Sequence, residues 1–207
     1  MAHKIAIIIG SLREGSLNRR VARSICALRG DNLDCSMIEI GDLPLYNQDL
    51  DTNPPEQWTR FRQQVGAADG VLFCSPEYNR GIPGVLKNAI DVGSRPYGQS
   101  VFDKKPAAIV TASPGSIGGF GANHQIRQAC VFLNMPVMQQ PEAYLGHVGD
   151  DSFDESGCLK EGPLKEIIQG LAHAFHDWVE MIHRSRQLLS EDSAHRAQET
   201  AAAKEHA

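Results

Sequence analysis

The segment GSLREGSLNRR, from Gly10 to Arg20, carries side chains that could bind a phosphate group. It lies between a short apolar run and a stretch of helical periodicity, so unpaired N–H groups at a helix start should point toward an anion there. The serine hydroxyls, the asparagine amide and the arginine guanidinium would add donors around the same point. We expect phosphate contacts from Ser11, Arg13, Ser16, Leu17 and Asn18. A serine or asparagine that only caps the helix would give the same pattern.

The same segment argues against nucleoside triphosphate chemistry. Gly10 and Gly15 have the spacing of the two glycines in a P-loop, but the next residues are Ser16 and Leu17. A P-loop needs a lysine there, which reaches the phosphates, followed by a hydroxyl residue that holds magnesium. The segment therefore gives no support for a nucleoside triphosphatase.

A second unusual turn follows the apolar run Gly70 to Cys74. It combines a rigid bend, an aromatic ring and polar backbone groups, on which a flat heterocycle could stack while main-chain groups bond to its edge. The plainer alternative is a tight turn before a helix that starts at Pro83, because proline suits the first helical turn. The residues of this turn are Pro76, Glu77, Tyr78 and Asn79.

The third turn, SPGSIGGFGA, runs from Ser113 to Ala122. It has four glycines within seven residues, which is more than a tight turn needs. Glycine lets the backbone approach a ligand closely, although a mobile surface loop would also be rich in glycine. We expect a ligand to approach the backbone at Gly115, Gly118 and Gly119, and Ser113 begins the turn.

Short apolar runs alternate with helical stretches, which predicts βαβ units and a parallel sheet. The three turns follow the first, third and fourth runs. In an open α/β sheet a ligand lies beyond the carboxyl ends of the strands, near the reversal of strand order, so these turns should meet. A Rossmann sheet requires GxGxxG after the first strand, and GSLREG lacks it. We therefore predict a flavodoxin-like, doubly wound open sheet of five parallel strands in the order 2-1-3-4-5.

The expected elements alternate along the chain as follows. The predicted strands are Lys4 to Ile9, Cys35 to Ile40, Gly70 to Cys74, Ala107 to Thr111 and a broken strand from Val137 to Leu145. The predicted helices are Leu17 to Leu28, Glu56 to Val65, Pro83 to Val92, Ala122 to Asn134 and a last helix whose apolar stripe runs from Leu164 to Ile182. We expect one domain, residues 1–189, and a disordered tail, residues 190–207, whose composition is polar and rich in alanine.

Composition limits the expected partners. A formal net charge of -5 over 207 residues gives no basic surface for nucleic acid. No stretch approaches the roughly 18 apolar residues that cross a bilayer, so no membrane contact is expected. The five cysteines are odd in number, scattered and without a CxxC pair, which favours a reducing, cytoplasmic location. Small molecules and further copies of the chain are the expected partners.

The sequence offers no convincing catalytic or metal-binding cluster. Cys74 ends an apolar run and is expected to be a small buried hydrophobe rather than a nucleophile. His173, His176 and Asp177 have helical spacing that could bind a metal, but a solvated helix flank is favoured and no metal is expected. His124 starts a helix and is expected at an interface between copies. The catalytic residues stay unassigned.

Three blocks of sequence resemble the NADPH-dependent FMN reductase family, and within it the quinone and chromate reductases. They are GSLREGSLN, PEYNRGIPGVLKNAID and SPGSIGGFGANHQIRQ, with DLPLYNQDL between the first two. The resemblance covers roughly Ile5 to Gly146. It implies that the first block holds the phosphate of FMN and that the second and third border the isoalloxazine ring. It also implies a homodimer or homotetramer.

By the same resemblance, the activity would be that of an NAD(P)H-dependent FMN reductase or quinone reductase. Hydride would pass from NADPH or NADH through flavin N5 to a small acceptor such as a quinone, chromate or an azo compound, in ping-pong order. A flavodoxin-type electron carrier and an FMN reductase that releases reduced flavin remain alternatives. A response-regulator receiver is excluded, because Gly10, Ser11 and Cys74 stand where it needs acidic residues.

One residue departs from the pattern of the family. Arg80 follows PEYN, where the family often has a small or aromatic residue. We hypothesise that Arg80 contacts an anionic substrate or the 2′-phosphate of NADPH. The alternative is a solvated side chain without a ligand.

Overall fold

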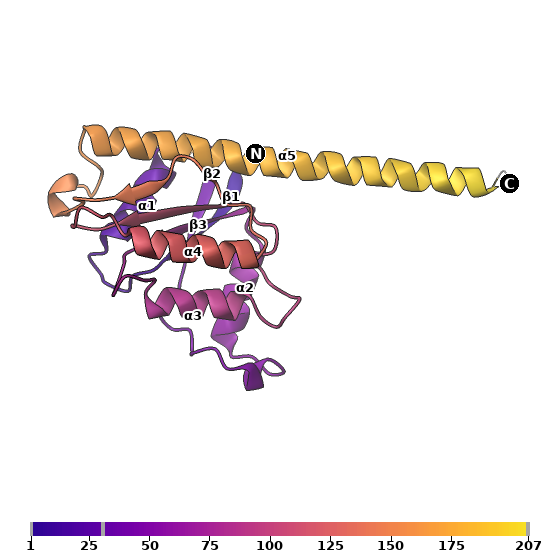
Figure 1. Ribbon diagram of the computed structural model, residues 1–207, viewed down its shortest axis with the longest axis horizontal. Coiled ribbons are helices and arrows are strands. Elements are labelled where there is room, and N and C mark those ends of the chain that lie inside the picture. Colours follow the sequence, from indigo (N-terminus) through magenta and orange to yellow (C-terminus); the bar gives the residue numbers. More distant parts are fainter. Residues whose placement is uncertain (1, 30–31, 206–207) are drawn as a thin grey trace.

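A computed structural model describes residues 2–29 and 32–205, with side chains described as far as Ala194 and at Arg196. It contains a five-stranded sheet in the order β2-β1-β3-β4-β5, in which all neighbouring strands are parallel. Figure 1 shows this sheet between layers of helices. The predicted fold class and strand order are confirmed.

The bounds of the elements are close to those predicted. The strands are β1 (His3–Ile9), β2 (Leu33–Ile38), β3 (Gly70–Ser75), β4 (Ala107–Ala112) and β5 (Ala143–Leu145). The helices are α1 (Leu17–Ala27), α2 (Glu56–Gly66), α3 (Gly84–Gly93), α4 (Phe120–Phe132) and α5 (Pro163–Glu205), with short 3-10 helices η1 (Gln48–Leu50) and η2 (Asp150–Ser152).

Helices cover both faces of the sheet. Ile5 and Ile7 of β1 point to the face covered by α1 and α5, whereas Ala6 and Ile8 point to the face covered by α2, α3 and α4. The central strands β3 and β4 are buried along their whole length, as expected for parallel strands covered on both sides. Each connection from a strand to the following helix therefore lies at the carboxyl edge of the sheet.

β2 and the fifth strand differ from the sequence-based expectation in register or extent. β2 pairs with β1 from His3 opposite Leu33 to Ile8 opposite Ile38, so it begins and ends two residues earlier than predicted. The broken fifth strand consists of β5 and an isolated bridge between Ala107 and Val137. Apolar alternation identifies such strands, but pairing with the neighbouring strand decides their ends.

The last helix continues through the segment expected to be a disordered tail. α5 runs to Glu205 and projects beyond the body of the protein, past the amino ends of the strands (Figure 1). Ser190, Glu191 and Asp192 are exposed, so these described residues join no core. The alanine, glutamate, glutamine and arginine residues of this segment are strong helix formers, which favours a continued helix. Residues 206–207 of the expected tail lie outside the described part of the chain.

The cysteines include one pair that the sequence pattern did not reveal. Cys26 in the last turn of α1 and Cys35 in β2 form a disulfide, with Cα atoms 6.2 Å apart. They meet because α1 packs on the sheet beside β2, which spacing alone does not show. Cys74 and Cys130 are buried free thiols, and Cys158 is exposed. Within the described residues, no helix has the length and hydropathy required for a bilayer span.

Candidate functional site

The first turn leaves the N-terminus of α1 open toward the carboxyl edge of the sheet. Ser16 caps α1, and its Oγ accepts a hydrogen bond from the Arg19 N–H at 3.3 Å. The N–H groups of Leu17 and Asn18 belong to the first helical turn, where the helix itself provides no acceptor. The first turn of α1, which the structure describes in full, contains no acidic side chain. No carboxylate within that turn therefore neutralises the positive end of the helix dipole. These groups suit an oxyanion.

Ser11 and the backbone of the turn add to this anion-binding geometry. Ser11 is buried, and its Oγ accepts a hydrogen bond from the Arg13 N–H at 3.4 Å, so its O–H can still donate to a ligand. A Cβ placed on Gly15 would meet no described atom within 4 Å. The Arg13 side chain is exposed. The turn therefore combines buried hydroxyl groups with an uncrowded backbone position at Gly15.

The Asn18 side chain holds the first turn to the third. Its Nδ2 donates to the Ala112 carbonyl at 3.0 Å, and its Oδ1 accepts from the Ala112 N–H, also at 3.0 Å. Both bonds are buried, and Ala112 ends β4 directly before the third turn. The amide thus has a positioning role in this structure. Its contact with a phosphate, implied by resemblance, stays a prediction.

The second turn is a two-residue turn closed by backbone hydrogen bonds. The Tyr78 N–H donates to the Gly81 carbonyl at 3.0 Å, and the Gly81 N–H donates to the Tyr78 carbonyl at 2.9 Å. The residues between them, Asn79 and Arg80, have φ values of 52° and 64°. Two positive φ values define a type I′ turn. It presents the half-exposed ring of Tyr78 next to the partly exposed Pro76.

Glu77 connects the second turn to the start of α4. Its Oε2 accepts a hydrogen bond from the Ala122 N–H at 2.9 Å, which is a favourable place for a carboxylate because of the helix dipole. Its Oε1 lies 3.7 Å from Arg80 Nη1. The Glu77 side chain therefore positions the turn, and its predicted contact with a ligand remains untested.

The third turn uses its glycines in two ways. Gly118 and Gly119 have φ values of 64° and 81°, and a Cβ on Gly118 would lie 2.4 Å from the Tyr144 carbonyl carbon. A Cβ on Gly119 would lie 2.8 Å from Thr111 Cβ. These glycines are thus required by close packing against β4 and β5. Gly115 is different, because a Cβ there would contact only Ser113 Oγ among the described atoms, at 3.8 Å.

The three turns meet at one edge of the sheet, as the sequence predicted. Besides the Asn18 and Glu77 bonds, the Gly10 N–H donates to the Cys74 carbonyl at 2.8 Å. A Cβ on Gly10 would lie 2.2 Å from Ser75 Oγ, so the first turn directly contacts the end of β3, where the second turn begins. Gln125 of α4 accepts a bond from the Ile82 N–H at 3.0 Å. Ser75 and Gln125 were not predicted from the sequence, because their roles depend on distances that no local pattern encodes.

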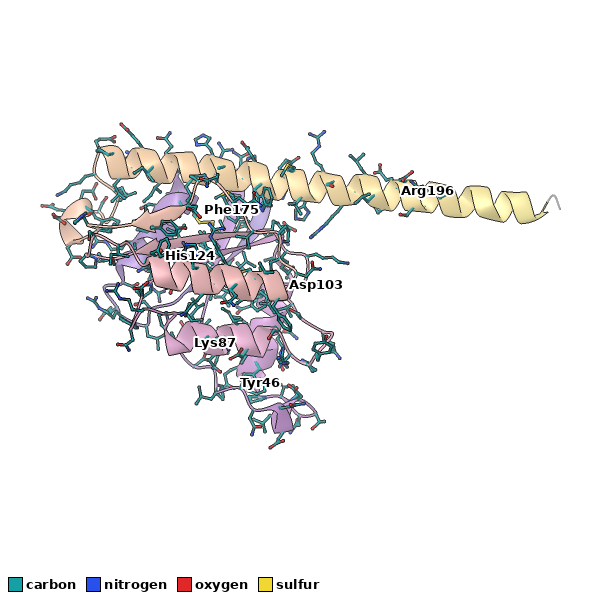
Figure 2. The ribbon with its side chains drawn as sticks, viewed as in Figure 1. Tyr46, Lys87, Asp103, His124, Phe175 and Arg196 are labelled. Carbon is teal, nitrogen blue, oxygen red and sulfur yellow. A yellow bond between two sulfur atoms is a disulfide. The ribbon has the colours of Figure 1, made fainter. Side chains whose placement is uncertain are left out.

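The polar groups near these turns are not activated nucleophiles. Burial raises the pKa of the Cys74 thiol far above its ordinary value, so no thiolate forms at neutral pH. Beside α4, His124 Nε2 lies 3.3 Å from Tyr144 Oη, and burial with the neighbouring Glu142 raises the pKa of that tyrosine. Figure 2 places His124 near the start of α4. Within the described residues, no cluster of three or more metal-ligating side chains occurs.

The sequence of the chain matches a known protein family over most of its length. Residues 3–150, which include all five strands and the three turns, match the family described as NADPH-dependent FMN reductase. The chain belongs to the NADPH-dependent FMN reductase family. It is accordingly an oxidoreductase that uses FMN and a nicotinamide nucleotide.

The first turn of this FMN reductase fits the phosphate of FMN. The open N-terminus of α1, with the buried Ser11 and Ser16 beside it, provides donors for an oxyanion. The Tyr78 ring and the open side of Gly115 provide flat surfaces for the ring system. The residues of the chain therefore fit the cofactor of the family.

Relatives and solved structures match this FMN reductase over most of their length. A quinone reductase from Pseudomonas putida is 52% identical over 180 residues, which cover 86% of this chain and 96% of the relative. A 2-hydroxy-1,4-benzoquinone reductase from a Burkholderia species is 41% identical over 179 residues, covering 86% and 97%. The solved flavoenzyme FerB, an NAD(P)H:(acceptor) oxidoreductase from Paracoccus denitrificans, is 35% identical with a TM-score of 0.82, covering 87% of this chain and 98% of FerB.

Proposed function

We propose that this FMN reductase reduces quinones, with NADPH or NADH as the electron donor and FMN held by the three turns. The observation that carries the proposal is the convergence of an open helix N-terminus, an exposed aromatic turn and a glycine turn at one edge of the sheet. The names of the Pseudomonas putida and Burkholderia relatives support quinones as acceptors.

Each turn has a separate task in this proposal. The N–H groups at the start of α1, with Ser11 and Ser16, bind the FMN phosphate, and Arg13 reaches it from the exposed side. Pro76, Tyr78 and Asn79 border one part of the isoalloxazine ring. On the opposite side the ring is bordered by Ser113, Gly115, Gly118 and Gly119.

The protein contributes binding and orientation rather than acid–base catalysis. Bound in this site, FMN would supply the hydride chemistry between the nicotinamide nucleotide and the acceptor, and solvent would supply the proton that completes the hydroquinone. The resemblance implies ping-pong order. The buried Cys74 thiol is protonated and does not compete as a nucleophile. Tyr78, half exposed, offers an aromatic face to whichever reactant lies over the ring. Chromate and azo compounds, which the sequence resemblance implies, are further acceptors for the same open surface.

We also propose that residues 1–189 form the FMN-binding domain and that it works as a cytoplasmic homodimer or homotetramer. Exposed apolar side chains on one helix support contact with another copy. They are Phe120, Val131 and Phe132 of α4.

The proposal is tested with the purified chain, a nicotinamide nucleotide and 1,4-benzoquinone, without any protein partner. The expected results are an absorption spectrum of bound oxidised flavin, bleaching on addition of NADPH or NADH, and return of the colour with the quinone. Protein stripped of FMN serves as the control and should oxidise no NADPH. Bleaching without quinone-dependent turnover would identify an electron carrier, and loss of flavin from the protein on reduction would identify a flavin-releasing reductase; both contradict the proposal.

A further inference from the structure

Arg80 adopts a backbone conformation that is unfavourable for its side chain. It is the second central residue of the type I′ turn, with φ of 64°, a position where glycine is favoured. The left-handed region places the Cβ of an L residue close to its own carbonyl oxygen. Asn79, at the first central position, belongs to the residue types that tolerate this region, whereas arginine does not. The turn would form more easily with glycine at position 80.

The folded structure does not require the arginine side chain. Arg80 is 75% exposed, and among the described residues its ion-pair partner is Glu77, at 3.7 Å. Glu77 makes a shorter bond to the Ala122 N–H, so it is held without Arg80. What the structure does fix is the backbone, because a Cβ on Gly121 would lie 2.7 Å from the Arg80 carbonyl oxygen. The turn therefore fixes the Arg80 backbone beside α4 and leaves the guanidinium exposed to solvent.

We propose that Arg80 forms an anion subsite at the mouth of the FMN site and binds an oxyanion of one of the two reactants. The group is either the 2′-phosphate of NADPH or the ionised hydroxyl of a hydroxyquinone. Both are oxyanions that a guanidinium binds with directed hydrogen bonds. Strained backbone persists only where the surrounding structure holds it, and such residues cluster at active sites and ligand sites. The inference rests on the proposed function, because it assigns the partner of one residue in that same site.

The test compares Arg80→Gly and Arg80→Lys with the unchanged holoenzyme. Arg80→Gly removes the charge and suits the positive φ, so the melting temperature should stay equal or rise. The preference for the reactant that carries the oxyanion over its counterpart without it should fall about tenfold in Arg80→Gly. This corresponds to the loss of one exposed, charge-assisted hydrogen bond of about 1.4 kcal/mol. Arg80→Lys should retain part of this preference. Calorimetry gives the Kd values of NADP⁺ and NAD⁺ for the oxidised enzyme, and steady-state rates give kcat/KM for 2-hydroxy-1,4-benzoquinone and 1,4-benzoquinone.

Lys104→Gly is the matched control. Lys104 is also an exposed cation with positive φ, at 62°, but it lies before β4 at the amino edge of the sheet. Its replacement should have a similar effect on the melting temperature and no effect on either discrimination ratio.

The outcomes separate the two sources of the anion. A changed ratio for NADP⁺ over NAD⁺ assigns the 2′-phosphate, and a changed ratio for the hydroxyquinone over benzoquinone assigns the acceptor. If both ratios in Arg80→Gly equal those of the unchanged enzyme, the proposal is overturned. The nucleotide affinities are measured without turnover, so a protein that fails to reduce quinones would contradict the proposed function while calorimetry still decides whether Arg80 binds the 2′-phosphate. In such a protein, equal NADP⁺ and NAD⁺ ratios in Arg80→Gly and the unchanged chain would overturn the proposal.

Discussion

Glycines with positive φ occur at both the carboxyl edge and the amino edge of the sheet, but their surroundings are packed differently at the two edges. At the carboxyl edge, Gly118 has positive φ and touches the backbone of Tyr144, and buried bonds such as that of Asn18 join one turn to another. At the amino edge, Gly98 also has positive φ, but a Cβ there would meet no described atom within 4 Å. The turns at the carboxyl edge pack against one another, whereas a side chain at Gly98 has room at the amino edge. Substitutions should therefore have larger effects at the carboxyl edge.

The largest expected difference is between Gly118→Ala and Gly98→Ala. Gly118→Ala should lower the free energy of unfolding by about 4 kcal/mol, because the strain of positive φ adds to a clash with backbone that cannot move away. Gly98→Ala should lower it by only about 1 kcal/mol, from the strain alone. Urea unfolding of both variants measures the difference. Equal losses would show that the carboxyl-edge turns are not sterically coupled.

Asn18→Ala tests the buried bonds between α1 and β4. The substitution leaves the Ala112 N–H and carbonyl buried without partners, so the free energy of unfolding should fall by about 3 kcal/mol. Asn134→Gly is the amino-edge control, because it removes an exposed amide bond to Asp103 at a position with positive φ and should change stability by less than about 0.5 kcal/mol. Chemical unfolding of the two variants side by side gives the comparison, and a small loss for Asn18→Ala would refute the positioning role.

Ser16→Asp separates helix capping from phosphate binding. Aspartate caps helices as well as serine does, so the melting temperature should stay nearly constant. Its carboxylate would repel the FMN phosphate at the start of α1, and the Kd of FMN should rise about tenfold, equivalent to about 1.4 kcal/mol. Ser16→Thr keeps both the cap and the hydroxyl and serves as the control. Flavin fluorescence titration provides the Kd, and unchanged affinity in Ser16→Asp would place the phosphate elsewhere.

The smallest expected effect concerns an ion pair at the amino edge. His3 Nε2 donates to Glu180 Oε2 at 2.8 Å, and this hydrogen bond lowers the pKa of Glu180 below its ordinary value of 4.5. A carboxyl group with a lowered pKa stabilises the fold above its unfolded pKa, and this contribution is lost as the pH falls through the folded pKa. Glu180→Gln should therefore flatten the fall in melting temperature between about pH 5 and pH 3. If the melting temperature of Glu180→Gln falls with pH in parallel with that of the unchanged protein, the His3–Glu180 pair is not a source of acid sensitivity. The affinity for FMN at neutral pH serves as the control.

Strand order and the meeting of the three turns could be predicted from the sequence, because they follow from local patterns and general topology. Apolar runs separated by helical stretches require parallel strands, and parallel strands bring their following turns to one edge. The position of Ser16 before a helix and that of Gly118 within a glycine-rich turn could be predicted for the same reason. These features depend only on residues that are close together in the sequence.

Features that depend on distances between remote residues could not be predicted. The bonds from Asn18 to Ala112 and from Glu77 to Ala122 join residues that only the completed sheet brings together. The disulfide between Cys26 and Cys35 has the same origin, because it depends on how α1 lies over β2. The course of α5 beyond Ser190 is a different case, in which helix propensity opposed the expectation drawn from polarity.

The long helix α5 makes the chain elongated, with the proposed flavin site and the projecting part of the helix on opposite sides. Its 43 residues correspond to a rod of about 65 Å that starts near the carboxyl edge and leaves the body at the opposite side. Such a particle tumbles anisotropically and migrates in gel filtration as if it were larger than its mass. An affinity tag or fluorophore attached after the last residue would be carried away from the flavin, so immobilised enzyme should keep its reactive edge facing solution.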